Sequence, residues 1–535
     1  MRTRTTDTTD PTDKPAGKRT SAVDQLRHAF RRRPGEHDHR VLYRVVQDAI
    51  RRGLLPAASQ LPPSRVLATA LDIARNTVVH VYAQLALEGY VQAGVGRGTF
   101  VARTVPRQLS TRSGTGLDAA DPGGDGSGDH LPADGIGKSP GPAPTPRTLL
   151  SRRGATLVDR AGAASLQWGA FTPGVPEVRQ FPAAVWSRLQ SRLWRNLAPP
   201  QLSYASGGGD AGLRYAIAEH LRATRGVHCA PEQVLVTSGT QQSLQLVAQL
   251  LADPGDAIWI EDPGYWGARS VFQALGLKLV PVRVDAEGLA PTAAQWRDAP
   301  RAVFVTPAHQ YPSGALMSAA RRRQLLDQAA LRGVWIIEDD YDSEFRYGSR
   351  PLPALQGLDT HQRVLFLGTF SKTLFPALRL AYVVLPPGLV EGFGRALAEL
   401  FREGQTPQQA VLARFISEGH YASHIRRMRA VYGARHDALI AAIAKHFGTT
   451  LPVMGGDAGL HLVLGLPPRV DDAALAQRIA QAGVASRPLS LYQMRRPATQ
   501  RGLVLGYGAV DEVDIARHFG RLAGVVERWL DLSRH

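Results

Sequence analysis

The sequence is poor in several features that mark particular classes of protein. Cys229 is the only cysteine among 535 residues, which excludes an internal disulfide framework and a cysteine-rich zinc site. No apolar run reaches the roughly 20 residues that a membrane-spanning helix needs. The first 19 residues lack the apolar stretch of a secretory signal. We therefore expect a cytoplasmic protein without a membrane segment, and no metal site is predicted.

Acidic residues are few relative to basic ones. The chain has 63 Lys or Arg against 46 Asp or Glu, which gives a net charge of +17. Residues 1–103 contain 17 of the basic residues and only nine of the acidic ones, so nearly half of the excess lies near the N-terminus. Cationic side chains gain affinity for nucleic acid by displacing counterions from phosphates. The N-terminal part is therefore a candidate nucleic-acid module.

The composition along the chain indicates several domains, because a chain of this length exceeds one hydrophobic core. Residues 1–38 are polar and predict a basic flexible tail. Residues 39–103 are compact in pattern. Residues 104–165 predict a linker, since 16 of the first 47 are Gly or Pro. Residues 166–535 alternate apolar strand-like runs with helical stretches and form a large C-terminal domain.

Residues 39–103 predict three helices followed by a two-stranded hairpin. Apolar residues recur at helical spacing from Val41 to Ile50, a short helix is expected over 64–71, and a third from Arg75 to Glu88. The glycines of residues 94–98 would turn the hairpin. This order is that of a winged helix-turn-helix, whose third helix enters the major groove. The side chains placed to meet DNA are Arg65, Arg75, Asn76, Thr77 and, in the wing, Arg97.

Gly53–Val101 resembles the GntR-type DNA-binding domain. Three short motifs carry the resemblance: Ser-Arg before an apolar helix, Arg-x-Thr-Val opening the next helix, and Glu-Gly-Tyr before a glycine-rich wing. The resemblance implies that the partner of this module is double-stranded DNA.

The large domain predicts an α/β fold. Continuous apolar strands between helices are typical of a parallel sheet that is covered on both faces. The runs that we interpret as strands are 234–237, 257–260, 302–306, 334–337 and 364–367.

Polar clusters follow these runs. Lys372 comes shortly after the last of them, and its amine could form a Schiff base with an aldehyde cofactor. Thr369, Ser371 and Arg379 flank it and could hold a phosphate. A lone lysine in a loop is more often a surface residue, so the interpretation depends on the other clusters.

The other clusters supply what such a cofactor needs. Asp339 ends a strand-like run and could pair with a protonated pyridine nitrogen, and a tyrosine beside it could donate to a phenolate. Residues 237–242 open a helix, where free amides suit a phosphate. Tyr265 follows a further run and could stack on a ring. Because the carboxyl ends of parallel strands meet at one edge of a sheet, these clusters predict one shared crevice.

From about Trp168 to the end, the chain resembles the fold-type-I pyridoxal-phosphate enzymes of the aminotransferase superfamily. The resemblance implies pyridoxal 5'-phosphate held by Lys372 as an internal aldimine. It implies that Asp339 faces the pyridine nitrogen, that Tyr341 approaches the phenolate oxygen and that Tyr265 stacks on the ring. The residues that it assigns to the phosphate are Thr240, Gln241, Thr369, Ser371 and Arg379.

Three further positions bear on assembly and ligand. Tyr204 matches a tyrosine that reaches the phosphate of the neighbouring subunit, which implies a homodimer with shared sites. Tyr311 stands where such enzymes have an asparagine. Val504 stands where they have the arginine that binds the substrate carboxylate, and Arg487 or Arg501 could substitute for it. Without that arginine, pyridoxal phosphate itself or an amine lacking a carboxylate is the favoured effector.

The whole chain resembles the MocR/GabR family of transcription regulators, through its domain order and the motifs His309–Gly314 and Glu338–Phe345. The resemblance implies a regulator whose large domain senses an amine or pyridoxal phosphate through Lys372 and controls operator binding, as a homodimer that is usually domain-swapped. An active aminotransferase with a fused DNA-binding domain is the alternative, and the replacements at Tyr311 and Val504 weigh against it. A DNA-binding scaffold without a cofactor is a third possibility, against which Lys372, Asp339 and Arg379 weigh.

Overall fold

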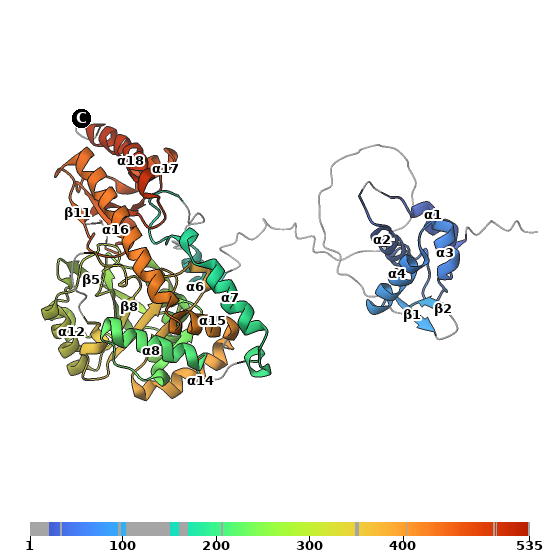
Figure 1. The fold of residues 1–535 in the computed structure, drawn as a ribbon, viewed down its shortest axis with the longest axis horizontal. Coiled ribbons are helices and arrows are strands. Elements are labelled where there is room, and N and C mark those ends of the chain that lie inside the picture. Colours follow the sequence, from blue (N-terminus) through green and yellow to red (C-terminus); the bar gives the residue numbers. More distant parts are fainter. Residues whose placement is uncertain are drawn as a thin grey trace, which may run out of the picture. The chain divides into compact units, whose positions relative to one another are not determined.

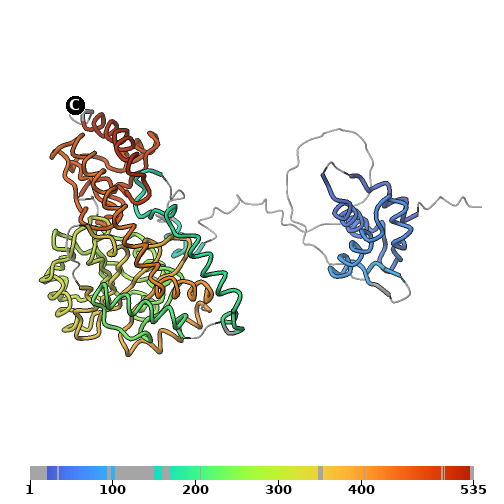
Figure 2. The backbone as a smooth tube through the Cα atoms, in the orientation of Figure 1, coloured from blue at the N-terminus to red at the C-terminus, as the bar shows by residue number. Residues whose placement is uncertain are grey.

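The computed structural model describes residues 21–32, 35–94, 98–102, 150–159, 169–204, 207–347, 353–402, 404–495, 498 and 500–532. The chain divides into two compact units, Met1–Ile136 and Gly137–His535, and each is described by itself (Figure 1). Figure 2 traces the same backbone as a tube. None of the helices in these ranges combines the length and the apolar character needed to span a membrane.

The N-terminal unit is a helical bundle with a β-hairpin. Its elements are α1 (Ala22–Ala29), α2 (Asp38–Arg51), α3 (Ser64–Leu71), α4 (Arg75–Leu87), β1 (Val91–Gly94) and β2 (Gly98–Val101). The predicted second and third helices are therefore present as α3 and α4. Leu42, Val78 and Leu85 are fully buried in the shared core. The hairpin is antiparallel, with Val91 opposite Val101 and Gly94 opposite Gly98, as the glycine positions predict.

Part of the segment predicted to be a flexible tail is helical instead. Ser21 caps α1, its hydroxyl accepting from the amide of Asp24 at 3.2 Å. Leu26 is 1 % exposed and joins the same core as α2 and α3. With only two turns, α1 is too short for a hydrophobic period to stand out from its polar surroundings. The N-terminal unit therefore begins well before residue 39.

The large unit is built on an eight-stranded sheet in the order β3-β10-β9-β8-β7-β4-β5-β6. Its strands are β3 (Val234–Thr237), β4 (Ala257–Asp262), β5 (Lys278–Asp285), β6 (Gly288–Leu289), β7 (Ala302–Val305), β8 (Trp335–Asp340), β9 (Val364–Thr369) and β10 (Ala381–Val384). Every residue of β7 is buried, with Phe304 on one face and Val303 and Val305 on the other. Helices therefore cover both faces, which is why the strands read as continuous apolar runs.

The prediction of a parallel sheet holds for its centre and is wrong at its margins. The strands β5, β4, β7, β8 and β9 are parallel, but β10 runs antiparallel to both β9 and β3, and β6 is antiparallel to β5. Ala381 at the start of β10 lies opposite both Thr369 and Thr237. The loop between β9 and β10 therefore turns at the edge of the sheet where β3 and β8 end.

Helices surround this sheet, and a smaller lobe follows it. The helices are α6 (Arg152–Asp159), α7 (Ala183–Trp194), α8 (Ala211–Arg225), α9 (Thr240–Leu251), α10 (Trp266–Ala274), α11 (Ala293–Arg297), α12 (Ala319–Arg332), α13 (Leu355–Leu358), α14 (Val390–Phe401), α15 (Thr406–Ser417), α16 (His420–Phe447), α17 (Asp472–Gln481) and α18 (Glu512–Leu532). The lobe has an antiparallel sheet of β11 (Val453–Met454), β12 (His461–Leu466), β14 (Arg501–Gly506) and β13 (Arg487–Pro488). The long helices α16 and α18 pack on each other (Figure 1).

The helix α6 lies inside the predicted linker of residues 104–165 and contacts α10.

Cys229 is 7 % exposed within the main core, and its burial raises the pKa of its thiol to about 11.

A buried ionic network holds the segment before α7 against the smaller lobe. Glu177 is 3 % exposed and lies 2.7 Å from Arg435 of α16 and 2.6 Å from Arg179. Both arginines also contact Asp511, which directly precedes α18. Burial alone would raise the pKa of Glu177, but hydrogen bonds from the two arginines outweigh it and lower this pKa to about 2.

Candidate functional site

A cavity of about 280 Å³ lies at the edge of the sheet where β8 and β9 end. It brings together nine of the ten side chains that the sequence predicts to contact a cofactor. These are Thr240, Gln241, Tyr265, Asp339, Tyr341, Thr369, Ser371, Lys372 and Arg379. The convergence follows from the topology, because β3, β4, β8 and β9 all point their carboxyl ends to this edge.

Lys372 lies in the loop after β9. Its Nζ donates a hydrogen bond of 2.6 Å to the carbonyl of Gly174, on the segment that leads to Glu177. Burial lowers the pKa of the Lys372 ammonium, and the nearby Arg487 adds to this effect although Asp342 and Asp339 oppose it. A lowered pKa increases the fraction of neutral amine, which is the form that can attack an aldehyde.

Asp339, near the end of β8, carries a buried carboxyl group. It is 4 % exposed, and its Oδ1 has no hydrogen-bond partner among the described residues. Burial, together with the negative charges of Asp340, Asp342 and Glu261, raises the pKa of Asp339 to about 8. A cation placed at this oxygen would compensate the buried charge and favour the ionised form.

The start of α9 and Arg379 form a cradle. Gly239 precedes α9 with φ at +114°, and a Cβ at this position would lie 2.8 Å from Nη2 of Arg379. Only glycine therefore lets the guanidinium approach the first turn of α9 so closely. Arg379 itself has a left-handed backbone, with φ at +51°. The free amides of a helix N-terminus and a guanidinium together suit a phosphate.

An aromatic side chain stands beside this cradle. Nε2 of Gln241 donates to the hydroxyl of Tyr265 at 3.0 Å, which fixes the ring at the wall of the cavity. The buried hydroxyl has its pKa raised to about 12, so Tyr265 stays neutral and its ring is available for stacking.

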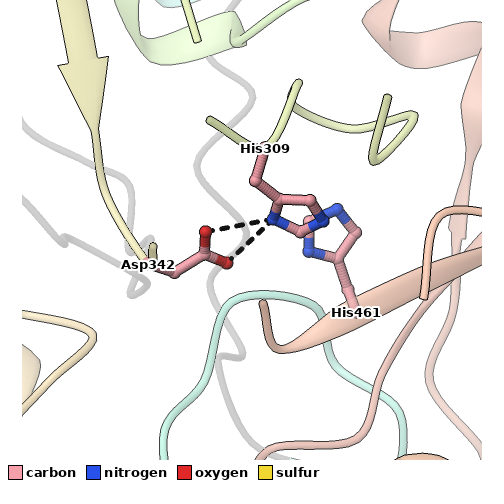
Figure 3. Close-up of side chains that lie close together, drawn as sticks. All are labelled: His309, Asp342 and His461. Atoms are coloured by element: carbon pink, nitrogen blue, oxygen red, sulfur yellow. Dashed lines mark hydrogen bonds and ion pairs between the residues drawn. The ribbon is translucent and has the colours of Figure 1, made fainter. Parts of the chain in front are cut away.

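A second cluster of side chains contacts the hydroxyl of Tyr341. Nδ1 of His309 lies 3.0 Å from Oδ1 of Asp342 and 3.0 Å from the hydroxyl of Tyr341. His461, at the start of β12, has its ring 5.0 Å from that of His309 (Figure 3). Its Nε2 lies 3.1 Å from the carbonyl of Pro312. Burial lowers the pKa of His461 well below its usual value, so this ring is neutral. The cluster positions the Tyr341 hydroxyl at the cavity.

The same three groups have the chemistry of metal ligands. One ligand atom each from His309, Asp342 and His461 lie within 4.8 Å of one another. However, Nδ1 of His309 and Nε2 of His461 already have hydrogen-bond partners within the protein. We therefore interpret the cluster as a support for Tyr341.

Sequence reasoning did not identify this cluster. His309 and Asp342 stand inside the two motifs that carry the family resemblance, so their place in those motifs was a usable signal. His461 had no such signal, because it begins a strand of the smaller lobe and reaches the cavity only through the tertiary fold.

Tyr204 and the predicted DNA contacts lie elsewhere. Tyr204 is 77 % exposed and does not line the cavity, so a role for it requires another subunit. In the N-terminal unit, Arg75 and Asn76 open α4 and are exposed, and Thr77 behind them is half-buried. Arg65 is exposed in the first turn of α3. Arg97 falls outside the described residues.

Comparison with known proteins identifies relatives of both units. Residues 176–502 match the family described as aminotransferase class I and II, and residues 39–101 match the bacterial regulatory proteins of the gntR family. The "Probable rhizopine catabolism regulatory protein MocR" of Rhizobium meliloti is 39 % identical, over 88 % of this chain and 90 % of that protein. The "HTH-type pyridoxine biosynthesis transcriptional regulator PdxR" of Corynebacterium glutamicum is 30 % identical, over 87 % and 91 %.

Among solved structures, LysN, the alpha-aminoadipate aminotransferase of Thermus thermophilus, is similar to the large unit. It has a TM-score of 0.64 and 26 % identity, and the match covers 70 % of this chain and 98 % of that one. That structure is a complex with N-(5'-phosphopyridoxyl)-L-leucine. The large unit therefore has the fold of the aminotransferases.

Proposed function

Because the chain belongs to the MocR-type transcription regulators, which join a GntR-family winged helix to an aminotransferase class I and II domain, we propose that its large unit binds pyridoxal 5'-phosphate. We further propose that an amine or the cofactor itself acts there as the effector and controls operator binding by the N-terminal unit. The aminotransferase family depends on this cofactor.

The observation that carries the proposal is the set of complementary groups in the cavity. Oδ1 of Asp339 is buried and has no hydrogen-bond partner among the described residues, so it is available to the pyridine nitrogen. The close approach of Gly239 and Arg379 forms a cradle for the phosphate. Lys372, which lines the same cavity, supplies an amine of lowered pKa. These three features match the three ends of the cofactor, so the residues present fit it.

Each remaining side chain has a definite task in this arrangement. The cofactor supplies an electrophilic carbon to which amines can attach. Tyr265 would cover the ring, and Tyr341, held by His309, would donate to the phenolate oxygen. The side chains that would add donors around the phosphate are Thr240, Gln241, Thr369 and Ser371.

The output lies in the N-terminal unit. Arg75, Asn76 and Thr77 at the start of α4 would contact base edges in the major groove. Arg65 would contact the DNA backbone, and Arg97 would reach the flanking minor groove or a phosphate. The exposed Tyr204 supports a homodimer in which this side chain reaches the phosphate of the partner subunit. A domain-swapped arrangement of this dimer is part of the proposal.

The visible absorption spectrum tests the cofactor site. Purified protein saturated with pyridoxal phosphate is compared with the Lys372→Ala variant and with Lys445→Ala, whose lysine is exposed on α16. We expect a band of lysine-bound cofactor in the wild type and in the control, and borohydride should bleach it. The Lys372→Ala variant should lack this band. A wild-type protein without the band would refute the proposed cofactor site.

DNA binding tests the coupling. An effector can shift a protein between two states only if it binds them with different affinity. Amines are therefore titrated into complexes of the protein with a DNA fragment selected by the wild type from a random pool. The Lys372→Ala variant should still bind the fragment but should not respond to amines. An unchanged response in this variant would refute a mechanism that acts through Lys372.

A further inference from the structure

Arg487 occupies a notable position in the smaller lobe. It is the first residue of β13 and lies directly opposite Val504 of β14. Directly opposed residues of an antiparallel pair project to the same face of the sheet, with Cβ atoms about 4.5–5.5 Å apart. Val504 is fully buried in an apolar cluster with Val463 and Leu489 and cannot bind an anion. A charge missing at Val504 is thus present one strand away.

The side chain of Arg487 lines the cavity together with Lys372. Its positive charge acts on the groups there, since it lowers the pKa of Lys372 and opposes the rise in the pKa of Tyr311. Its hydrogen-bond partner is the hydroxyl of Tyr492, a neutral group. No carboxylate of the described residues forms an ion pair with Arg487.

The two other arginines near the cavity or on β14 are engaged differently. Arg501 pairs with the fully buried Asp472 at 3.2 Å and does not line the cavity. Arg379 lies against Gly239 in the phosphate cradle. Arg487 is therefore the cavity arginine whose charge no part of the proposed cofactor compensates. A guanidinium of this kind binds a carboxylate or sulfonate through two parallel hydrogen bonds.

We infer that the effector is an amine that also carries an anionic group, a carboxylate or a sulfonate, and that Arg487 binds this group. The inference rests on the proposed function, because the amine is taken to meet the cofactor beside Lys372. It replaces the sequence-based expectation of an effector without a carboxylate. That expectation was based on the absence of an arginine at position 504. The sequence alone did not show that β13 pairs with β14.

Matched amines test the inference on cofactor-saturated protein. The probes are 3-aminopropanoate and 2-aminoethanesulfonate, with propylamine as the uncharged counterpart, and the change in the absorbance of the lysine-bound cofactor reports binding. The wild type should bind at least one anionic probe about tenfold or more tightly than propylamine. Charge-assisted hydrogen bonds of this strength correspond to about 10- to 100-fold in affinity.

Three variants locate the effect. Arg487→Gln should lose about 10- to 100-fold in affinity for the preferred anionic probe and change by less than about twofold for propylamine. Arg487→Lys should retain part of the preference, because it keeps the charge but loses the fork. The control Arg478→Gln, on the exposed face of α17, should behave as the wild type.

The outcomes separate the two proposals. A wild type that binds no anionic probe more tightly than propylamine, including one that binds none of the probes, overturns the inference. So does an anion preference that survives in Arg487→Gln. In both cases an intact band of lysine-bound cofactor leaves the proposed function standing. Absence of that band in the wild type would instead remove the proposed function itself.

Discussion

Replacing Glu177 by glutamine should destabilise the large unit in a pH-dependent way. The folded protein lowers the pKa of this carboxyl group from 4.5 to about 2. One pKa unit corresponds to about 1.4 kcal/mol, so the ionised group contributes about 3 kcal/mol to the free energy of unfolding at neutral pH. Removal of the charge also takes away the carboxylate at 2.7 Å from the buried Arg435 and leaves it with Asp511 at 3.1 Å. The loss in Glu177→Gln is therefore expected to reach about 3 kcal/mol or more.

The sign of the pH dependence follows from the lowered pKa. The contribution is complete above the unfolded-state pKa of 4.5 and is lost as the pH falls toward 2. The difference between the wild type and Glu177→Gln should therefore be largest at pH 7. More than about half of it should be gone at pH 3.

Urea unfolding followed by tryptophan fluorescence measures this difference. All eight tryptophans of the sequence lie at residue 168 or beyond, so the signal reports on the large unit. Glu391→Gln is the matched control, because its ion pair with Arg395 on α14 is exposed and should contribute less than about 1 kcal/mol. A loss below about 1 kcal/mol in Glu177→Gln at pH 7, or an equal loss at pH 7 and pH 3, would refute the reasoning.

Three further predictions concern the cofactor, DNA and the first helix. Gly239→Ala should weaken the binding of pyridoxal phosphate in a spectral titration, because its Cβ would lie 2.8 Å from Nη2 of Arg379; unchanged affinity would contradict the cradle. Arg75→Ala should weaken binding to the selected DNA fragment about tenfold or more, and an unaltered salt dependence and affinity would remove Arg75 from the interface. Leu26→Ala should destabilise the N-terminal unit by about 2–5 kcal/mol, measured by thermal unfolding of that unit followed by circular dichroism. An unchanged stability would contradict the packing of α1 in its core.

The sequence could predict that side chains of the proposed cofactor site share one cavity, because each lies at or just after the end of an apolar strand. Lys372, Asp339 and Tyr265 stand at strand ends, and parallel topology carries strand ends to one edge. The direction of β10 could not be predicted, because a strand of four buried residues has the same apolar pattern whether it runs parallel or antiparallel to its neighbours. The loop of Lys372 nevertheless reaches the right edge, since β10 returns along β9.

Features that depend on tertiary pairing escaped prediction. Arg487 and Val504 are separated by 17 positions in sequence and become neighbours only through the register of β13 on β14. His461 reaches the cavity from the other lobe in the same way. The helix α1 was missed for a different reason, because the helical spacing of Ala22, Leu26 and Phe30 spans only two turns within a polar segment. Local pattern thus predicts positions at strand ends better than partners across a sheet.

The burial of Cys229 has a practical and a physiological consequence. A thiol reacts with oxidants and maleimides as its thiolate, and the pKa of about 11 keeps this one protonated at neutral pH. The native thiol is thereby protected from oxidation at neutral pH. Because the thiol is also shielded, a cysteine introduced at the exposed Leu87 in α4 can be labelled selectively. A fluorophore at that point would report movements of the DNA-binding unit directly, with the native cysteine left in place.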